Sequence, residues 1–322
     1  MNSITTLLNP GILFFLLGLI AALLRSNLSI PESLIKFLGL YLMLSIGFKG
    51  GVSLYHSSLF GDGLIILGII IVMSALIPLL LFFLLRREHG VADAAAIGAT
   101  YGSNSTLTYI TAAGFLTSSG IAFGGYMTVA LVVMETPAIL LALILARRFK
   151  SGDAPHHPMR QVVHSAFTDG TIIVLVGSLV IGYLLTALGS EASPLASFIS
   201  GDFFTGMLVF FLLYMGTTVG HQLRSLKSFP ASLVFLALGV PLFNGLIAIG
   251  FSAVFSFQPG DAFLLAILCA SASYIVAPAI LQEALPEANP AKYLSMSLGI
   301  TFPFNIVIGI PLFWWLIKAL GL

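Results

Sequence analysis

Residues 100–108, Thr-Tyr-Gly-Ser-Asn-Ser-Thr-Leu-Thr, place a polar run in the middle of the apolar segment 92–117. Residues 271–274, Ser-Ala-Ser-Tyr, interrupt the apolar segment 260–285 in the same way, at an offset of 168 positions. Polar groups are stable in hydrocarbon only where helices pack closely around them or where a broken helix lines a site. We therefore expect two related membrane helices, each interrupted near its middle.

The composition is that of a membrane protein. Of the 322 residues, 58% are hydrophobic and 8% charged, with a mean hydropathy of +1.09, whereas a soluble domain has roughly 25% charged residues. The net charge of +1, with basic residues scattered at helix ends, excludes a nucleic-acid-binding protein. Since a helix needs about 20 apolar residues to cross a bilayer, we predict an all-α integral membrane protein of about ten transmembrane helices. They lie near residues 11–25, 33–55, 63–86, 92–117, 124–148, 168–188, 203–223, 229–256, 260–285 and 292–318.

Basic residues are distributed unequally between the loops. Ten of the thirteen Lys and Arg residues follow odd-numbered helices, and the loops after helices two, four, six and eight contain none. Because cytoplasmic loops retain Lys and Arg, both termini are predicted outside and residues 150–167 form a cytoplasmic linker. The linker histidines, His156, His157 and His164, have no Cys or acidic partner at ligand spacing, so we expect no metal site other than one for Na⁺.

The two halves of the chain resemble one another. Residues 46–54, Ile-Gly-Phe-Lys-Gly-Gly-Val-Ser-Leu, match residues 215–223, Met-Gly-Thr-Thr-Val-Gly-His-Gln-Leu, at an offset of 169. Two further matches, at offsets of 168 and 167, are Asp93 with Asp261 and Tyr126 with Tyr293.

Near-equal offsets predict a duplicated unit. The first five-helix repeat comprises residues 1–149, the linker residues 150–167, and the second repeat residues 168–322. Because each repeat has an odd number of helices, the second enters the membrane upside down, which is common among secondary transporters.

The two polar stretches allow two interpretations. Small hydroxyl residues let helices pack closely and hydrogen-bond to one another. Alternatively each stretch breaks its helix, so that amides at the half-helix N-terminus bind an anion while carbonyls and hydroxyls hold Na⁺. Their occurrence at matched positions favours a binding site. Its candidate residues are Gly102, Ser103, Asn104, Ser105, Thr106, Ser271, Ala272 and Ser273.

Two ionisable residues are expected within the membrane. Glu135 and Thr136 precede Pro137, which frees a carbonyl one turn back as a further cation ligand. Lys49 is the matching buried cation. Both Glu135 and Lys49 are candidates for ion coupling; an ion pair between them, or a Lys49 side chain that extends to the interface, is the structural alternative.

Other polar residues have structural explanations as well. Asp93 and Asp261 open helices four and nine, where N-capping accounts for both. Asn244 and Asn305 line a cavity or bridge helices. All six histidines lie in loops or near helix ends, and Cys269 is a lone small residue in an apolar run. We therefore expect neither an enzyme nor a bound cofactor.

The order of several motifs resembles the SbtA-type sodium-dependent bicarbonate symporters, best known from cyanobacteria. The likeness runs through nearly the whole chain. Its motifs are Ile30-Pro31-Glu32-Ser33, Ile46-Gly47 with Gly50-Gly51, Gly98-Ala99 before Gly102-Ser103, Glu135 with Pro137-Ala138, Ala288-Asn289-Pro290-Ala291 with Tyr293, and Gly309-Ile310-Pro311-Leu312-Phe313.

The resemblance implies a ten-helix inverted-repeat fold in the bacterial cytoplasmic (inner) membrane. It further implies a homotrimer in which a sliding core moves bicarbonate and Na⁺ from the site where the two broken helices meet. Tyr274 stands where the family has an acid, and is included among the candidate ion-coupling residues with Asn305. The linker is shorter than in cyanobacterial members, which leaves the PII-like regulator of that family as an open question.

The expected function is therefore secondary active import of a small anion, bicarbonate by the resemblance, with Na⁺ as the coupling ion. Two alternatives remain open. A proton-coupled symporter of another small organic or inorganic anion would use Glu135 and depend on pH, and a passive anion channel would need no coupling ion.

Overall fold

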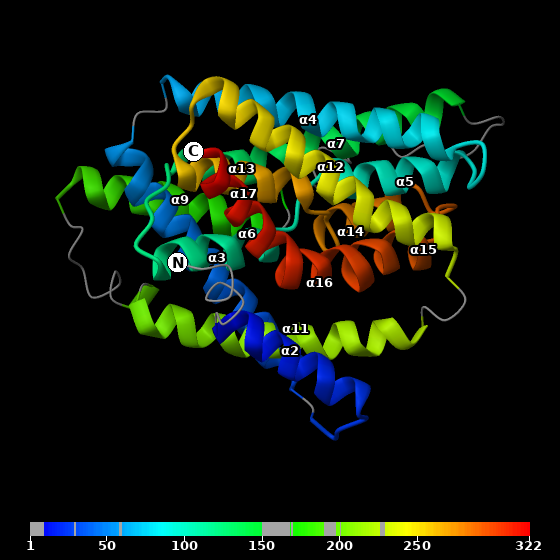
Figure 1. Ribbon diagram of the computed structural model, residues 1–322, viewed down its shortest axis with the longest axis horizontal. Helices are drawn as coiled ribbons and strands as arrows, with labels where there is room; N and C mark the ends of the chain where they lie inside the picture. The colour runs from blue at the N-terminus through cyan, green and yellow to red at the C-terminus, as the bar shows by residue number, and fades with distance from the viewer. Residues whose placement is uncertain are drawn as a thin grey trace.

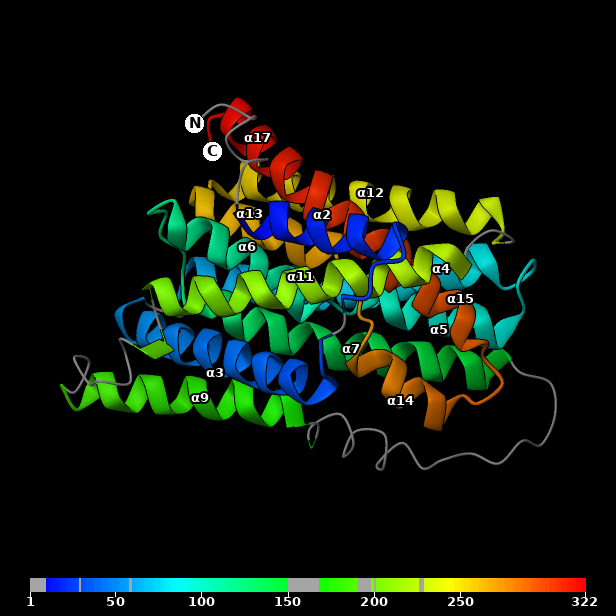
Figure 2. The same cartoon turned by 90° about the horizontal axis from the view of Figure 1, so that it is seen from below.

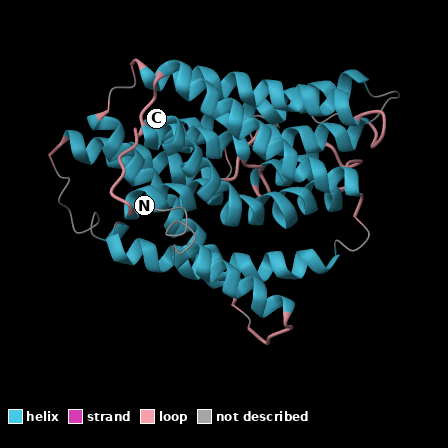
Figure 3. Ribbon diagram, in the orientation of Figure 1, coloured by secondary structure: helices cyan, strands magenta, loops and turns pink. Residues whose placement is uncertain are grey.

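The computed structural model describes residues 10–28, 30–57, 60–149, 168, 170–189, 198–199, 201–225 and 229–322. Every regular element in these residues is a helix, as Figure 3 shows. The predicted all-α class is therefore confirmed.

Six helices in the described ranges are long and apolar enough to cross a membrane. Five are continuous: α3 (Glu32–His56), α4 (Asp62–Leu85), α7 (Tyr126–Phe149), α11 (Gly201–Ser225) and α12 (Ala231–Phe255). The sixth consists of α15 (Pro290–Leu294), η2 (Ser295–Thr301), α16 (Phe302–Phe304), η3 (Asn305–Gly309) and α17 (Ile310–Leu320), where η denotes π-helical turns. Shorter apolar helices are α2 (Pro10–Leu23), α9 (Gly170–Ala187) and α13 (Pro259–Ala270).

Both predicted interruptions are present. The segment 92–117 forms two helices, α5 (Val91–Gly102) and α6 (Thr106–Ser118). The segment 260–285 forms α13 and α14 (Val276–Ala284). In Figure 3 the connecting residues are pink stretches in the interior of the bundle. The prediction that these two helices are discontinuous is confirmed.

The helices form two groups. In the first, which we call the scaffold bundle, α2 packs along α11 and α3 packs along α9. Figure 1 shows α2 beside α11 at the lower edge, and Figure 2 shows α3 beside α9. The second group, which we call the site bundle, comprises α4 to α7 and α12 to α17 and contains both interrupted helices.

Matched glycines bring the scaffold helices together. A Cβ on Gly47 of α3 would lie 2.4 Å from the carbonyl oxygen of Leu175 in α9. A Cβ on Gly216 of α11, which matches Gly47 at the offset of 169, would lie 2.0 Å from the carbonyl oxygen of Phe15 in α2. Small residues are needed at both positions because the backbones approach so closely.

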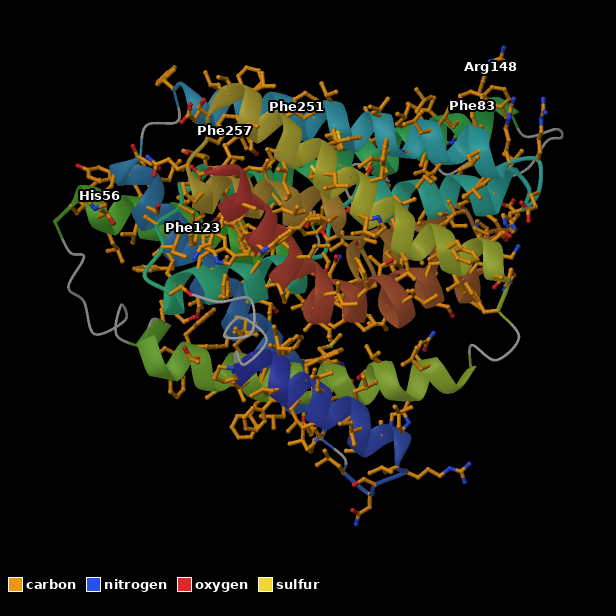
Figure 4. The ribbon with its side chains drawn as sticks, viewed as in Figure 1. His56, Phe83, Phe123, Arg148, Phe251 and Phe257 are labelled. Atoms are coloured by element: carbon orange, nitrogen blue, oxygen red, sulfur yellow. The ribbon has the colours of Figure 1, made fainter. Side chains whose placement is uncertain are left out.

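The two ends of the bundle differ in charge. Arg148 and Phe83 lie at one end of the long axis in Figure 4, and His56 lies at the other. Arg86 shares the first end, with its guanidinium 4.6 Å from the centroid of the Phe83 ring. The predicted linker, residues 150–167, lies outside the described residues.

Candidate functional site

The two helix interruptions are joined by reciprocal hydrogen bonds. The amide of Ser105 donates to the hydroxyl of Ser271, with N and Oγ 3.0 Å apart. The amide of Ser273 donates to the carbonyl of Thr100 at 2.8 Å. Each interruption thus satisfies a backbone group of the other, as buried polar groups at membrane depth require.

Serines also stabilise the start of each half-helix. The Ser105 hydroxyl accepts hydrogen bonds from the amide and the hydroxyl of Thr108, at 3.2 and 2.9 Å. The Ser273 hydroxyl accepts from the amide of Ala277 at 3.1 Å. Because α6 and α14 begin at the crossing while α5 and α13 end there, positive and negative helix-dipole ends meet in one place. Such a place attracts an anion to the amides and a cation to the carbonyls.

A small cavity lies between the interruptions. It leaves about 10 Å³ for the centre of a water-sized species, which is room for about one water molecule. A bare Na⁺ ion fits this space, whereas a polyatomic anion does not fit in this conformation. The lining residues are Asn104, Ser105, Thr106, Leu107, Glu135, Ser273, Tyr274, Ile275 and Val276.

Buried oxygen atoms near the crossing have no hydrogen-bond partner among the described residues. Asn104 donates its amide to the carbonyl of Leu131 at 2.7 Å, and its Oδ1 is unpartnered. Asn305 donates to the carbonyl of Ala270 at 2.8 Å, at the end of α13, and its Oδ1 is likewise unpartnered. The Ser103 hydroxyl also has no hydrogen-bond partner among the described residues. An unsatisfied buried polar atom costs about 1–3 kcal/mol, and of these three oxygens the one on Asn104 belongs to a residue that lines the cavity.

Glu135 and Lys49 occupy separate environments. Glu135 is 4% exposed and lines the cavity from α7. The Nζ of Lys49 lies over the Phe204 ring, 4.1 Å from its centroid, with no hydrogen-bond partner in the described part of the chain. The alternative in which Lys49 forms an ion pair with Glu135 is therefore wrong. The Lys49 ammonium group instead makes a cation–π contact with Phe204 of α11.

Tyr274 separates the cavity from a larger cleft. Its ring packs edge-on against Phe302, with centroids 5.2 Å apart, and its hydroxyl lies beside the Ser105 side chain. The cleft has a volume of about 580 Å³ and runs between α3, α11 and the second interruption. Leu107, Tyr274 and Ile275 line both spaces. The remaining cleft residues are Ile35, Lys36, Gly39, Leu40, Met43, Gly170, Phe211, Tyr214, Met215, Thr218 and Leu298.

Asp93 and Asp261 do not cap their own helices, contrary to the prediction. Asp93 on α5 pairs with Lys292 of α15 at 2.5 Å. Asp261 on α13 accepts hydrogen bonds from the amide of Gly124, at 2.7 Å, and the hydroxyl of Tyr126, at 2.5 Å. Each carboxylate connects an interrupted helix of one half of the chain to the last helix of the other half.

The structure brings six predicted site residues to the cavity: Asn104, Ser105, Thr106, Glu135, Ser273 and Tyr274. Three others are buried but do not line it: Ser103, Ser271 and Ala272. Gly102 has a packing role, since a Cβ there would lie 2.3 Å from Cγ of Pro78. Lys49, Thr136 and Asn305 also lie outside the cavity lining. Asn244 is buried on α12, and its Nδ2 is unpartnered in the described chain.

One link near the site was not predicted. The Thr301 hydroxyl donates to the carbonyl of Ala237 at 2.6 Å, and the hydroxyl of Tyr101 lies 2.6 Å from Thr301 Oγ1. This chain of hydrogen bonds connects α5, next to its break, with the π-helical turn η2. Tyr101 lies within the polar run from which the site was predicted, but a π-helical turn has no comparable sequence signal.

Comparison with known families agrees with this geometry. The sequence profile of the Na⁺-dependent bicarbonate transporter superfamily matches residues 10–318. Among curated proteins no relative matches. A transporter superfamily is not an enzyme class, so the expectation of a membrane protein without enzymatic activity is confirmed, as is the resemblance to the SbtA-type symporters. Because the profile covers nearly the whole chain and both helix interruptions, the chain belongs to the Na⁺-dependent bicarbonate transporter superfamily.

Proposed function

We propose that this protein imports bicarbonate by symport with Na⁺. The observation that carries the proposal is the cavity between the two helix interruptions, which admits one small cation and is lined by Glu135. The description of the superfamily, Na⁺-dependent bicarbonate transport, supports the same ion and substrate for this chain.

The proposed Na⁺ site is built from oxygen atoms of residues that line the cavity. Asn104 provides an Oδ1 without a protein partner, Ser105 and Ser273 provide hydroxyls, and Glu135 provides a carboxylate. A carboxylate at membrane depth is stable when a cation neutralises it, so binding of Na⁺ and burial of Glu135 support one another.

The anion binds at the N-termini of α6 and α14, where helix amides face the crossing. In this conformation the cavity is too small for bicarbonate. We therefore assign anion binding to a conformation in which the wall formed by Leu107, Tyr274 and Ile275 opens toward the cleft. The bound Na⁺ adds a positive charge nearby, which couples the affinities of the two solutes.

The proposed transport mechanism requires that the two halves of the chain form an inverted repeat of five helices each. Two pairs of matched positions support this topology. Gly47 and Gly216 make equivalent contacts between the halves, and Asp93 and Asp261 make equivalent clamps across them. We propose that the site bundle slides against the scaffold bundle, in an elevator-like motion, so that the cleft opens alternately at either end. The end that carries Arg148 is the cytoplasmic one by the distribution of basic residues.

The driving force sets a limit on accumulation. With one Na⁺ per bicarbonate the step is electroneutral, and a tenfold Na⁺ gradient supplies about 1.4 kcal/mol, or about tenfold accumulation. A second Na⁺ would make the step electrogenic and add about 2.3 kcal/mol at 100 mV.

The test is uptake of radiolabelled bicarbonate into proteoliposomes, with an inward Na⁺ gradient or an equal K⁺ gradient. We expect saturable accumulation with Na⁺ alone, and a loss of about tenfold or more in Glu135→Gln, equivalent to about 1.4 kcal/mol or more of ion binding. Thr117→Ala is the control, because its hydroxyl donates to Ala113 of its own helix, outside the cavity. Uptake that is equal with both cations would refute Na⁺ coupling.

The buried position of Glu135 also favours a second candidate, proton-coupled anion symport. A carboxyl that binds a proton on one side of the membrane and releases it on the other can replace the Na⁺ step. The same vesicles distinguish the two, because proton coupling predicts uptake driven by an inward pH gradient in the absence of Na⁺.

A further inference from the structure

Lys49 is the buried charge that the proposed mechanism leaves unused. Its Nζ is buried against Phe204 and makes no hydrogen bond among the described residues. Ser45, one turn earlier on the same face of α3, is fully buried, and its hydroxyl lies beside the Tyr41 side chain without a hydrogen bond of good geometry to the described residues. The Tyr41 hydroxyl, a further turn away, donates to the carbonyl of Phe198 at 2.6 Å. Since an ammonium group without a counter-ion among the described residues is costly in a membrane helix, even over an aromatic ring, its presence points to contact with an anion in another conformation.

The matched positions of the second repeat line the open cleft. At the offset of 169, Ser45 corresponds to Tyr214 and Lys49 corresponds to Thr218. Tyr214 and Thr218 both line the cleft. The same face of the matched helix is therefore open in one repeat and buried in the other.

The helix faces that pack opposite these residues also differ in exposure between the two halves. Phe204 and Leu208 of α11 are buried, and Leu208 packs so closely on α6 that a Cβ on Gly114 would lie 2.9 Å from it. Their matched residues on α3, Ile35 and Gly39, line the open cleft. The matched positions of the two halves thus form one open cleft and one buried counterpart.

We propose that Lys49 and Ser45 bind the anion in the access route that is closed here, and that Lys36 has this role in the open cleft. Lys36 lines the cleft. The two lysines are thirteen positions apart on α3, or about 20 Å along the helix, so they lie at different depths of the bundle. The ligand is a small oxyanion, whose charge the ammonium neutralises and whose oxygens accept hydrogen bonds from both groups. This inference rests on the proposed function and names the residues that the anion meets first.

Cysteine labelling tests the two routes without measuring transport. Cys269 is fully buried, so Ser45→Cys and Thr218→Cys can each be introduced into the otherwise native chain, which also provides the background. In oriented proteoliposomes, we expect a membrane-impermeant maleimide to label Thr218→Cys from the face that carries Arg148, and Ser45→Cys from the opposite face only. Labelling of both from one face overturns the proposal. So does a Ser45→Cys that stays unlabelled with every combination of Na⁺ and bicarbonate while Thr218→Cys reacts.

Sided kinetics test the charge itself. We expect Lys49→Gln to raise the KM for bicarbonate about tenfold for transport that starts on the Ser45 side and to leave the KM from the other side unchanged. Lys36→Gln should raise the KM for bicarbonate only for transport that starts on the side opposite Ser45. Lys49→Arg should have the native KM from both sides. Equal changes on both sides, or the same change in Lys49→Arg, overturn the proposal. If Ser45→Cys and Thr218→Cys are labelled from opposite faces but the native protein takes up no bicarbonate, the proposed substrate is refuted. The proposal of two access routes would still be supported.

Discussion

The amide of Ser105 and the hydroxyl of Ser271 lie 3.0 Å apart and join the two interrupted helices. In Ser271→Ala the buried Ser105 amide loses its acceptor, which should lower the free energy of unfolding by about 1–3 kcal/mol. The measurement is a thermal unfolding scan of the purified protein in detergent.

Ser252→Ala is the matched control for this change. Ser252 is fully buried too, but its hydroxyl donates to Ala248 of its own helix at 2.9 Å, where the carbonyl already accepts a helical hydrogen bond. We expect this variant to unfold within a few degrees of the native protein. Equal destabilisation of Ser252→Ala and Ser271→Ala would contradict a special role for the crossing.

Asp261 and Tyr126 provide a second test, at the clamp between the halves. Asp261→Ala and Tyr126→Phe each remove one side of the hydrogen bond between these side chains, and each should lower the free energy of unfolding by about 1–3 kcal/mol. The double variant should lose less than the sum, with a coupling energy of about 1 kcal/mol or more. Strict additivity in the same unfolding assay would show that the two side chains do not act on one another.

The sequence was sufficient to predict the two interruptions, and six of the predicted site residues line the cavity between them. A polar run in a membrane segment has few stable arrangements, so residues 100–108 and 271–274 restricted the fold strongly. The same reasoning predicted a polar environment for Glu135, which lines the cavity, because a carboxyl in a long apolar helix requires a polar partner or cavity.

Contacts between segments that are distant in the sequence could not be predicted from local sequence patterns. An Asp in the first turn of a helix looks the same in the sequence whether it caps that helix or binds a donor elsewhere, so the clamps of Asp93 and Asp261 were missed. For Lys49 the sequence offered a carboxylate of opposite charge as the obvious partner. The ring of Phe204 was brought closer by the packing of α3 against α11, which no local pattern encodes.

Tyr274 allows a prediction about coupling. Its side chain belongs to the wall that the cavity shares with the cleft, so Tyr274→Ala should connect the two spaces. We expect Na⁺ to pass without bicarbonate, and radiolabelled Na⁺ uptake in bicarbonate-free vesicles should rise while bicarbonate accumulation falls. Tyr274→Phe keeps the ring against Phe302 and should not leak. A leak of equal size in both variants would assign the seal to the hydroxyl instead of the ring.

Gly182 and Gly177 of α9 test whether the scaffold bundle must be rigid for transport. A Cβ on Gly182 would lie 2.3 Å from the carbonyl oxygen of Phe48, whereas a Cβ on Gly177 meets nothing within 4 Å. Because the obstacle is backbone, Gly182→Ala must separate α9 from α3, at a cost of about 1–3 kcal/mol, and Gly177→Ala should have little effect. The separation would also shift the face of α3 that carries Lys49. Gly182→Ala should therefore lower both the unfolding temperature and the rate of Na⁺-driven uptake. Loss of stability with a native uptake rate would mean that the scaffold tolerates displacement, and that the site bundle carries the coupling alone.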